Sequence, residues 1–464
     1  HSRNVFLSSS YIKLEVGTIV RCPFSELQHV VDRMQESFPV SGVHTQELSR
    51  NVDRWIREGQ AAVLCSLAVA YFIFYYFSGT LFFDIIHFLL HKCARSRIRL
   101  LRQISKVHSV HHWYFDRHLH YNEKYRILNA LTNLPLELSC QLVGSWLSER
   151  ALSWILQRDQ REFATTILHL TLIIEFIRVV VVIYLGGRDT SHISFHSVPK
   201  DRDWILVGPE YHSLHHMYPD QFMSSLFRLF DWTLGTSSTL KNKRITMTGV
   251  NGAFGAALKK ELKSDGVESI KALRYGVDFF DDDSVSAECI KTLRDTDILI
   301  LAHGLRYGDV MKANYETSRR LVELFAQHRK PLESRRPQEL PEVWYVGSEI
   351  EIHPSWGSKS LGAYSASKRR FLPFAKSLYD SDSVVYRHIV LAAFSSRMGP
   401  AIVSADWAAR WTMWWIRRGS KYVPVTYTGF AYLNFFKFLF KIKAEVNGLR
   451  FSGDGMKVEG SKDV

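Results

Sequence analysis

The stretch VHSVHH at Val107–His112 recurs as YHSLHH at Tyr211–His216, and a His-x-x-x-His pair, His87 and His91, precedes the first copy. Residues three and four positions apart share one face of a helix, so each copy directs its imidazoles toward one point. This repetition predicts that the first half of the chain is a helical scaffold around a metal site. Three scattered histidines are better explained as ordinary polar residues: His118, His120 and His169.

The length, charge and cysteine content of the chain indicate which classes of protein it can belong to. A chain of 464 residues is long enough for two or three domains, and 46% hydrophobic content suffices for sizeable cores. The net charge of +13 suits an anionic partner. Long apolar runs favour a membrane and exclude nucleic acid as that partner. Five widely spaced cysteines without a C-x-x-C pair indicate free thiols in a reducing compartment.

Three apolar stretches, at 61–83, 127–147 and 163–185, are long enough to cross a bilayer, although the last two contain charged residues. Buried helices of a soluble core are the alternative for those two. Three crossings place the early and late histidines on the same side of the membrane. The basic residues between 92 and 106 make that side cytosolic. We therefore expect a multi-pass protein of the endoplasmic reticulum or another intracellular membrane, with its histidines and its C-terminal domain in the cytosol.

Neutral imidazole suits iron, copper and zinc, but a structural zinc needs only four ligands, so this number of histidines favours two metal ions. The histidine motifs, together with Asp84 and the segment LFRLFDWTLGT at Leu226–Thr236, resemble the fatty acid hydroxylase and sterol desaturase superfamily of membrane di-iron enzymes. The family pattern includes an intermediate histidine, for which His192 and then His196 are the candidates. The expected ligands are His87, His91, His108, His111, His112, His192, His196, His212, His215 and His216.

The resemblance covers about residues 61–240 and implies two iron ions that activate oxygen to hydroxylate or desaturate a lipid, either sterol-like or fatty acyl. Its first motif departs from the family, with Phe88 where arginine is common. The resemblance also implies an electron donor of the cytochrome b5 or ferredoxin type, because the chain contains no haem or iron–sulfur motif. Three carboxylates are candidates for orienting the imidazole N–H groups: Asp84, Glu123 and Glu210.

A second domain begins after a change of composition at 238–244, where short strands alternate with helices in the pattern of a parallel α/β fold. Strands are expected at Ile245–Met247, Ile298–Ala302, Val343–Ser348 and Val384–Ala392. Two aromatic segments near the end, Trp407–Trp415 and Tyr427–Phe440, are flanked by basic residues and predict a surface that rests on lipid headgroups.

The turn TGVNGAFG follows the first strand and opens a helix, so a pyrophosphate can sit at the helix N-terminus. A tyrosine and a lysine four residues apart share a helix face, where the ammonium can lower the pKa of the phenol. These features resemble the short-chain dehydrogenase/reductase family over 243–440. The expected cofactor contacts are Thr248, Gly249, Gly252, Gly255, Ala302, Gly304 and Lys368, and the expected catalytic residues are Ser348, Tyr364, Lys368 and Asn314.

This resemblance implies that Tyr364 is the general acid/base, and that Lys368 shifts the pKa of Tyr364 and contacts the ribose. It also implies that Ser348 binds the substrate carbonyl and that Asn314 supports a water molecule of the proton relay. Only residues 256–301 separate Gly255 from Ala302, which is fewer than the family uses. The second strand and its helix are therefore expected to be shortened. Arg274 slightly favours NADP over NAD.

The expected protein is a multi-domain fusion of an α-helical membrane domain with a C-terminal α/β Rossmann-like domain. Its domains are 1–60, helical and polar; 61–240, membrane; 243–440, NAD(P)-binding; and 441–464, a polar tail. The expected function is a bifunctional membrane oxidoreductase that hydroxylates or desaturates a lipid and interconverts an alcohol and a carbonyl. The alternatives are a wax-type enzyme that processes long-chain aldehydes and, from another class, a histidine-rich membrane metal transporter.

Overall fold

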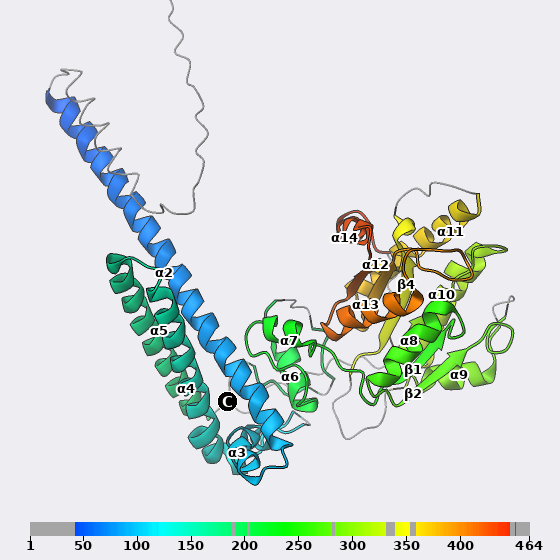
Figure 1. Ribbon diagram of the computed structural model, residues 1–464, viewed down its shortest axis with the longest axis horizontal. Coiled ribbons are helices and arrows are strands. Elements are labelled where there is room, and N and C mark those ends of the chain that lie inside the picture. The colour runs from blue at the N-terminus through cyan, green and yellow to red at the C-terminus, as the bar shows by residue number, and fades with distance from the viewer. Residues whose placement is uncertain are drawn as a thin grey trace, which may run out of the picture. The chain divides into compact units, whose positions relative to one another are not determined.

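The computed structural model describes residues 42–117, 119–186, 191–195, 197–201, 205–280, 284–330, 339–352, 359–445 and 451. The chain divides into two compact units, residues 1–74 and 75–464. The described part of the first unit is the beginning of one long helix. The elements are shown in Figure 1.

The histidine-bearing part of the chain is helical. Helix α2, at Gly42–Ala94, contains 53 residues, about 80 Å at 1.5 Å per residue. It continues past the predicted apolar span, so His87 and His91 lie on its last turns. The other helices of this part are α3 (Arg99–Tyr114), the short η1 (Glu123–Tyr125), α4 (Arg126–Ser153), α5 (Arg158–Tyr184), α6 (Pro209–Met217) and α7 (Leu229–Leu234).

Helices α2 and α4 cross where both have glycine. A Cβ atom added to Gly144 would lie 2.8 Å from the Cα atom of Gly79, so no larger residue fits at this crossing. Polar side chains flank the contact: Gln141 donates to Thr80 Oγ1 at 2.9 Å, and Ser145 donates to the Tyr75 carbonyl at 2.9 Å. Small residues with interhelical hydrogen bonds are a packing mode typical of membrane helices.

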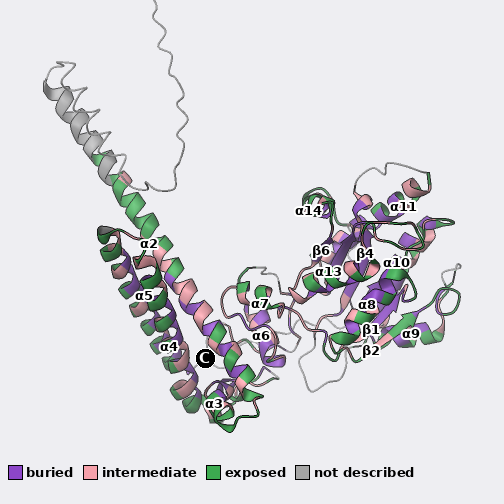
Figure 2. Ribbon diagram, viewed as in Figure 1, coloured by how far each residue is buried: buried purple, intermediate pink, exposed green. Residues whose placement is uncertain are grey.

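Two of the described helices are long and apolar enough to cross a membrane, Glu58–Ala94 and Gln160–Tyr184, a judgement by length and composition only. They correspond to the first and third predicted spans. The second predicted span lies in α4, which does not meet this test. Figure 2 shows many exposed residues along α2 and α5, and these include Ile173 and Phe176 on α5.

The C-terminal part is a single six-stranded parallel sheet in the order β2-β1-β3-β4-β5-β6. Its strands are β1 (Arg244–Thr248), β2 (Ser269–Leu273), β3 (Ile298–Leu301), β4 (Glu342–Ser348), β5 (Val385–Leu391) and β6 (Tyr422–Val425). Its helices are α8 (Ala253–Ser264), α9 (Ala287–Arg294), η2 (Lys312–Glu316, a π-helix), α10 (Thr317–His328), η3 (Glu349–Glu351), α11 (Lys359–Arg370), α12 (Leu372–Asp380), α13 (Ala405–Arg417) and α14 (Phe430–Phe440).

Helices cover both faces of this sheet. On one face, Leu258 of α8 and Met413 of α13 join a core with Trp344 of β4. On the other face, Phe325 of α10 and Leu378 of α12 join a second core. This is a doubly wound arrangement, in which ligands bind beyond the carboxyl ends of the strands where the strand order reverses. Here that point lies between β1 and β3.

The structure confirms the four positioned strands to within one residue at either end. It places the second strand, for which no position was predicted, at Ser269–Leu273 and adds β6, which was not expected. The sheet ends at β2, whereas the common six-stranded order 3-2-1-4-5-6 has another strand beyond it. The short interval between Gly255 and Ala302 therefore corresponds to the loss of that outer strand. The segment Trp407–Trp415 lies in α13, whose inner face packs on the sheet while Trp411 and Trp414 stay exposed.

Candidate functional site

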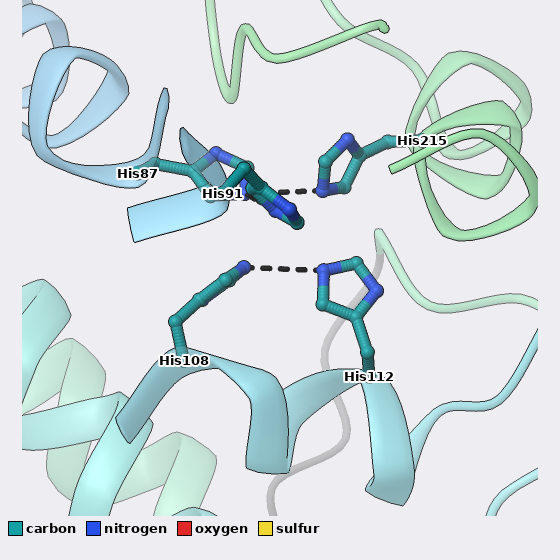
Figure 3. A group of neighbouring side chains, drawn as sticks. All are labelled: His87, His91, His108, His112 and His215. Carbon is teal, nitrogen blue, oxygen red and sulfur yellow. Dashed lines mark hydrogen bonds between the residues drawn. The ribbon is translucent and has the colours of Figure 1, made fainter. Parts of the chain in front are cut away.

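Nine histidines from four segments of the chain form two adjacent groups. In each group, the ring nitrogens that face one another all lie within 4.8 Å. Figure 3 shows the first group, with His87 and His91 from α2, His108 and His112 from α3, and His215 from α6. The second group consists of His111, His192, His212 and His216. His196 and His118 lie outside the described residues, and the exposed His120 and His169 belong to neither group.

Two rings of the first group face each other with unprotonated nitrogens. His87 donates from Nδ1 to the Met223 carbonyl at 3.2 Å, and His215 donates from Nδ1 to the Gln221 carbonyl at 2.9 Å. A neutral imidazole has one N–H, so both Nε2 atoms carry lone pairs. These atoms lie only 3.0 Å apart. Two such acceptors repel unless a cation lies between them.

The spacing of these nitrogens fits metal coordination. Two nitrogens bound at about 2.1 Å and at right angles to one another are about 3.0 Å apart. His91 Nε2 lies 3.1 Å from His87 Nε2, and His108 Nε2 lies 3.2 Å from His112 Nε2. Burial lowers the pKa of His108 to about 3 and the pKa of His215 to about 4. Both rings are therefore neutral near pH 7, as metal ligands must be.

The second group repeats this geometry around His192, the intermediate histidine expected from the sequence. Its Nε2 atom lies 3.0 Å from that of His111 and 2.9 Å from that of His212. His216 donates from Nδ1 to the Phe115 carbonyl at 2.8 Å, which leaves its Nε2 unprotonated, 3.2 Å from His212 Nε2. Rings of the two groups are in contact, with 4.6 Å between the centroids of His112 and His216. The donor set therefore fits two neighbouring metal ions.

A buried carboxylate holds the turn that orients His87. Asp231, in the segment Leu226–Thr236, accepts hydrogen bonds from the amides of Met223 and Ser224 at 2.9 and 2.7 Å. It also accepts from Tyr211 Oη at 2.8 Å. These contacts fix the peptide whose carbonyl receives the His87 Nδ1 proton. Asp231 thus acts on the ring through the backbone.

The outer acceptors of these rings differ from the carboxylates suggested by the sequence. For His87, His215 and His216 the acceptor is a backbone carbonyl, and for His108 it is Asn133 Oδ1 at 2.9 Å. Asp84 is buried and accepts from the amide and hydroxyl of Ser225 instead. No sequence motif marks the backbone acceptors, because any residue type supplies a carbonyl.

The nucleotide turn has the close contacts that require glycine. Gly249 has φ +66°, and a Cβ atom there would lie 2.6 Å from the Ala302 carbonyl oxygen. A Cβ atom on Gly255 would lie 2.0 Å from the Gly249 carbonyl oxygen. Gly252 is the N-cap of α8. The turn therefore packs helix α8 tightly against the carboxyl ends of β1 and β3, where a pyrophosphate can reach its N-terminus.

A threonine and a histidine join the ends of these two strands. His303 donates from Nε2 to the Ala313 carbonyl at 2.9 Å, so its Nδ1 accepts from Thr248 Oγ1 at 2.7 Å. The amide of Ala302 donates to the same hydroxyl at 3.2 Å. Burial lowers the pKa of His303 to about 4, which keeps the ring neutral. The sequence identified Thr248 as a cofactor contact but not this bond.

Tyr364 and Lys368 lie one turn apart on α11 and line one cavity of about 900 Å³. Lys368 Nζ donates to the Val346 carbonyl at 2.9 Å and lies 5.9 Å from the centre of the Tyr364 ring. Burial lowers the pKa of Lys368 to about 8 and raises the pKa of Tyr364. The expected lowering of the phenol pKa is therefore absent in this state, because burial dominates. Apolar side chains surround the two residues, and the lining includes Phe254, Leu361, Phe394, Met398, Tyr427 and Phe430.

Asn314 and Ser348 are both placed by local structure. Asn314 lies in the π-helix η2, fully buried, where it accepts from the Leu305 amide at 2.7 Å and donates to the Leu305 carbonyl at 2.8 Å. It also donates to Ser367 Oγ at 2.9 Å. Ser348 ends β4 at the cavity wall. Asn314 therefore fixes the loop after β3 against α11.

Sequence reasoning missed Glu351, a fully buried carboxylate beside Ser348. Its Oε2 accepts from the Ser348 amide at 3.1 Å, and its Oε1 lies 2.7 Å from His388 Nε2. His388 Nδ1 in turn contacts Tyr386 Oη at 2.8 Å. A Cβ atom on Gly347 would lie 2.4 Å from Glu351 Oε2. A G-S-E sequence at a strand end is the only signal, and it is too common to be informative.

No family model matches the chain. A monoglucosyldiacylglycerol epimerase of Synechocystis sp. is 29% identical over 266 residues, which cover 51% of this chain and 63% of that protein. The chain thus spans less than two thirds of the length of this relative.

Solved structures of short-chain dehydrogenases also resemble the chain. One from Burkholderia phymatum in complex with NAD covers 45% of this chain and 99% of its own, with 14% identity and a TM-score of 0.35. One from Sphingobium yanoikuyae in complex with NADPH covers 44% and 98%, with 15% identity and a TM-score of 0.33. The fold assignment rests on the sheet order, the glycine turn and the placement of Ser348, Tyr364 and Lys368. Residues 244–425 form a Rossmann-like domain, a six-stranded parallel sheet with helices on both faces.

Proposed function

We propose that this protein is a membrane-bound lipid oxidoreductase with two centres, a di-iron centre held by histidines and an NAD(P)-dependent alcohol/carbonyl centre. The contact between His87 Nε2 and His215 Nε2 carries the first part, because two lone pairs 3.0 Å apart call for a cation. The two apolar helices and the apolar cavity support a lipid substrate.

An all-imidazole donor set suits iron better than calcium, magnesium or manganese, which prefer oxygen ligands. When bound, iron supplies the activation of oxygen that hydroxylation or desaturation of an unactivated C–H bond requires. The chain itself keeps the rings neutral by burial and fixes their orientation through Met223, Gln221 and Phe115. A cytochrome b5-type or ferredoxin-type donor would supply the electrons.

At the second centre, a bound nicotinamide cofactor would supply the hydride chemistry, and side chains of the protein would transfer the proton. Tyr364 would give its phenolic proton to a carbonyl oxygen, or take one from a hydroxyl, while Ser348 holds that oxygen. The charge of Lys368 favours the phenolate. Asn314 keeps the loop after β3 in place. The turn from Gly249 to Gly255 would hold the pyrophosphate at the start of α8.

The test uses the full chain in lipid nanodiscs. Metal analysis should find iron in the wild type and in His120→Ala, whose ring lies outside both groups, but much less in His111→Ala. NAD(P)-linked turnover of a long-chain alcohol should fall about 10²–10⁴-fold in Tyr364→Phe, the range for loss of a general acid/base. It should persist in the control Tyr307→Phe, which alters an exposed tyrosine that does not line the cavity. A wild type without iron would refute the proposed di-iron centre. Full turnover in Tyr364→Phe would refute the proposed NAD(P)-dependent centre.

A second candidate for the NAD(P) centre is the epimerisation of a sugar carried by a lipid, favoured by the printed name of the epimerase relative. A sugar C–H hydrogen would leave as hydride to the oxidised nicotinamide while the O–H proton passes to Tyr364. Return of both to the ketone, with the hydride on the opposite face, inverts the carbon without net oxidation. Conversion of monoglucosyldiacylglycerol to its epimer without consumption of added NAD(P) would favour this candidate over the alcohol/carbonyl reaction.

A further inference from the structure

Helix α14 is apolar on two opposite faces. One face packs on the dehydrogenase-like domain, with Ala431 and Phe438 in its core and Asn434 donating to the Glu349 carbonyl at 2.9 Å. On the other face, Leu433 is 53% exposed, Phe436 is 56% exposed and Phe440 is 79% exposed. A helix with an outer face of this kind normally has its second face covered as well.

This exposed face is continuous with the mouth of the cavity that contains Tyr364. Phe430, the first residue of α14, lines the cavity and is 49% exposed. Leu433 and Phe436 follow it at three-residue spacing, so one stripe extends from the mouth along the helix. The cavity lining also includes Met398, which is 38% exposed, and Ile402, four residues further along the chain, is 86% exposed. Partly exposed apolar side chains from two segments, Phe430 and Met398, therefore belong to the cavity lining.

Basic residues accompany this stripe. Lys441 and Lys443 follow the end of α14 and are exposed. An apolar helix face with lysines beside it is the combination that binds the headgroup region of anionic membranes. The chain as a whole carries a net charge of +13.

We propose that this face of α14 docks on a lipid bilayer, so that a lipid passes from the membrane directly into the cavity of Tyr364. A helix of 11 residues is only about 17 Å long, too short for the roughly 800 Å² per partner of a stable protein interface, but long enough to lie in a bilayer surface. The apolar helices α2 and α5 would keep the domain near that surface. The proposal rests on the proposed lipid substrate of the NAD(P) centre.

The first test locates the partner by photocrosslinking. A photoreactive amino acid replaces Phe436 in the full chain, reconstituted in vesicles of phosphatidylcholine and phosphatidylserine. The control carries it in place of Glu288, whose exposed side chain lies on α9. Lipid adducts at position 436 and not at 288 are expected. Crosslinks to a second copy of the chain, or no lipid adduct at 436, would overturn the proposal.

The second test separates substrate delivery from chemistry. Leu433→Ser/Phe436→Ser alters two residues that do not line the cavity. We expect kcat/KM for a long-chain alcohol in vesicles to fall about tenfold or more, while kcat/KM for a water-soluble short-chain alcohol is unchanged. An equal loss for both substrates, or for neither, would contradict membrane delivery. A wild type inactive on both alcohols would instead contradict the proposed NAD(P) function, and the crosslinking result would still report on docking.

Discussion

His87 Nε2 and His215 Nε2 lie 3.0 Å apart, although 128 positions of sequence separate the two residues and each ring is held from behind by a backbone carbonyl. Because neither nitrogen carries a proton, their approach is favourable only around a cation. The first group of histidines is thus arranged for a metal by contacts outside the group.

Removal of one of these facing rings should lower the metal content. In His215→Ala the remaining four donors of the first group lose their partner on α6, so about half of the iron should be lost while the second group keeps its ion. Metal analysis of protein purified in nanodiscs measures this. His169→Ala, which alters an exposed ring outside both groups, is the control. Equal iron in both variants would show that the first group holds none.

A contact behind His108 provides a finer test. Asn133→Leu keeps the branched shape of the side chain on α4 but removes the acceptor of the His108 Nδ1 proton. Loss of such an outer contact typically lowers metal affinity 10–100-fold. The matched control is Asn129→Leu, one turn earlier on the same helix and equally buried, where Oδ1 has no hydrogen-bond partner among the described residues. Iron retention during titration with a chelator measures the difference, and similar curves for the two variants would refute the role of Asn133.

The pKa of Lys368 predicts an alkaline limit to dehydrogenase activity. Burial lowers this pKa to about 8, so the ammonium that supports the phenolate is lost as the pH rises through about 8. We expect kcat/KM, which reports groups of the free enzyme, to fall above that pH. In Lys368→Arg the rate should be lower, but the alkaline fall should disappear, because guanidinium stays charged. A fall at the same pH in Lys368→Arg would assign it to another group.

We expect the choice of cofactor to depend on Arg274, the residue after β2. Arg274 is exposed at the carboxyl end of this strand, and its Nε lies 3.7 Å from Asp278 Oδ2. If the guanidinium binds a 2′-phosphate, Arg274→Ala should raise KM for NADPH about tenfold, or about 1.4 kcal/mol, and leave KM for NADH nearly unchanged. Lys291→Ala on α9 is the control for loss of an exposed charge. A parallel change in both KM values would contradict selection of NADP by Arg274.

The sequence predicted the parts of the fold that depend on local periodicity. Spacings of three and four placed the His108 and His212 motifs on helices, and runs of buried residues marked β1, β3, β4 and β5. It did not give the position of β2, whose Ser269 and Lys271 break the apolar run, and it missed β6, which contains Pro424.

The sequence predicted some residues of the candidate site and missed others. His192, Tyr364 and Lys368 were expected because the motifs that contain them resemble those of known families. Glu351 and the carbonyl of Met223 were not, because their roles come from tertiary packing alone. The sequence could not predict the direction of the Tyr364 pKa shift either, since burial and the nearby charge of Glu351 both raise that pKa.

The glycine crossing of α2 and α4 lies two turns before His87 on the same continuous helix. Two of the nine imidazoles therefore take their position from contacts between apolar helices, whereas the nucleotide turn depends on a separate core. Solubilisation in a harsh detergent, which loosens helix association, should accordingly strip the metal before it abolishes dinucleotide binding. An extract that still binds NAD(P) is therefore no guarantee that the histidine centre has survived purification.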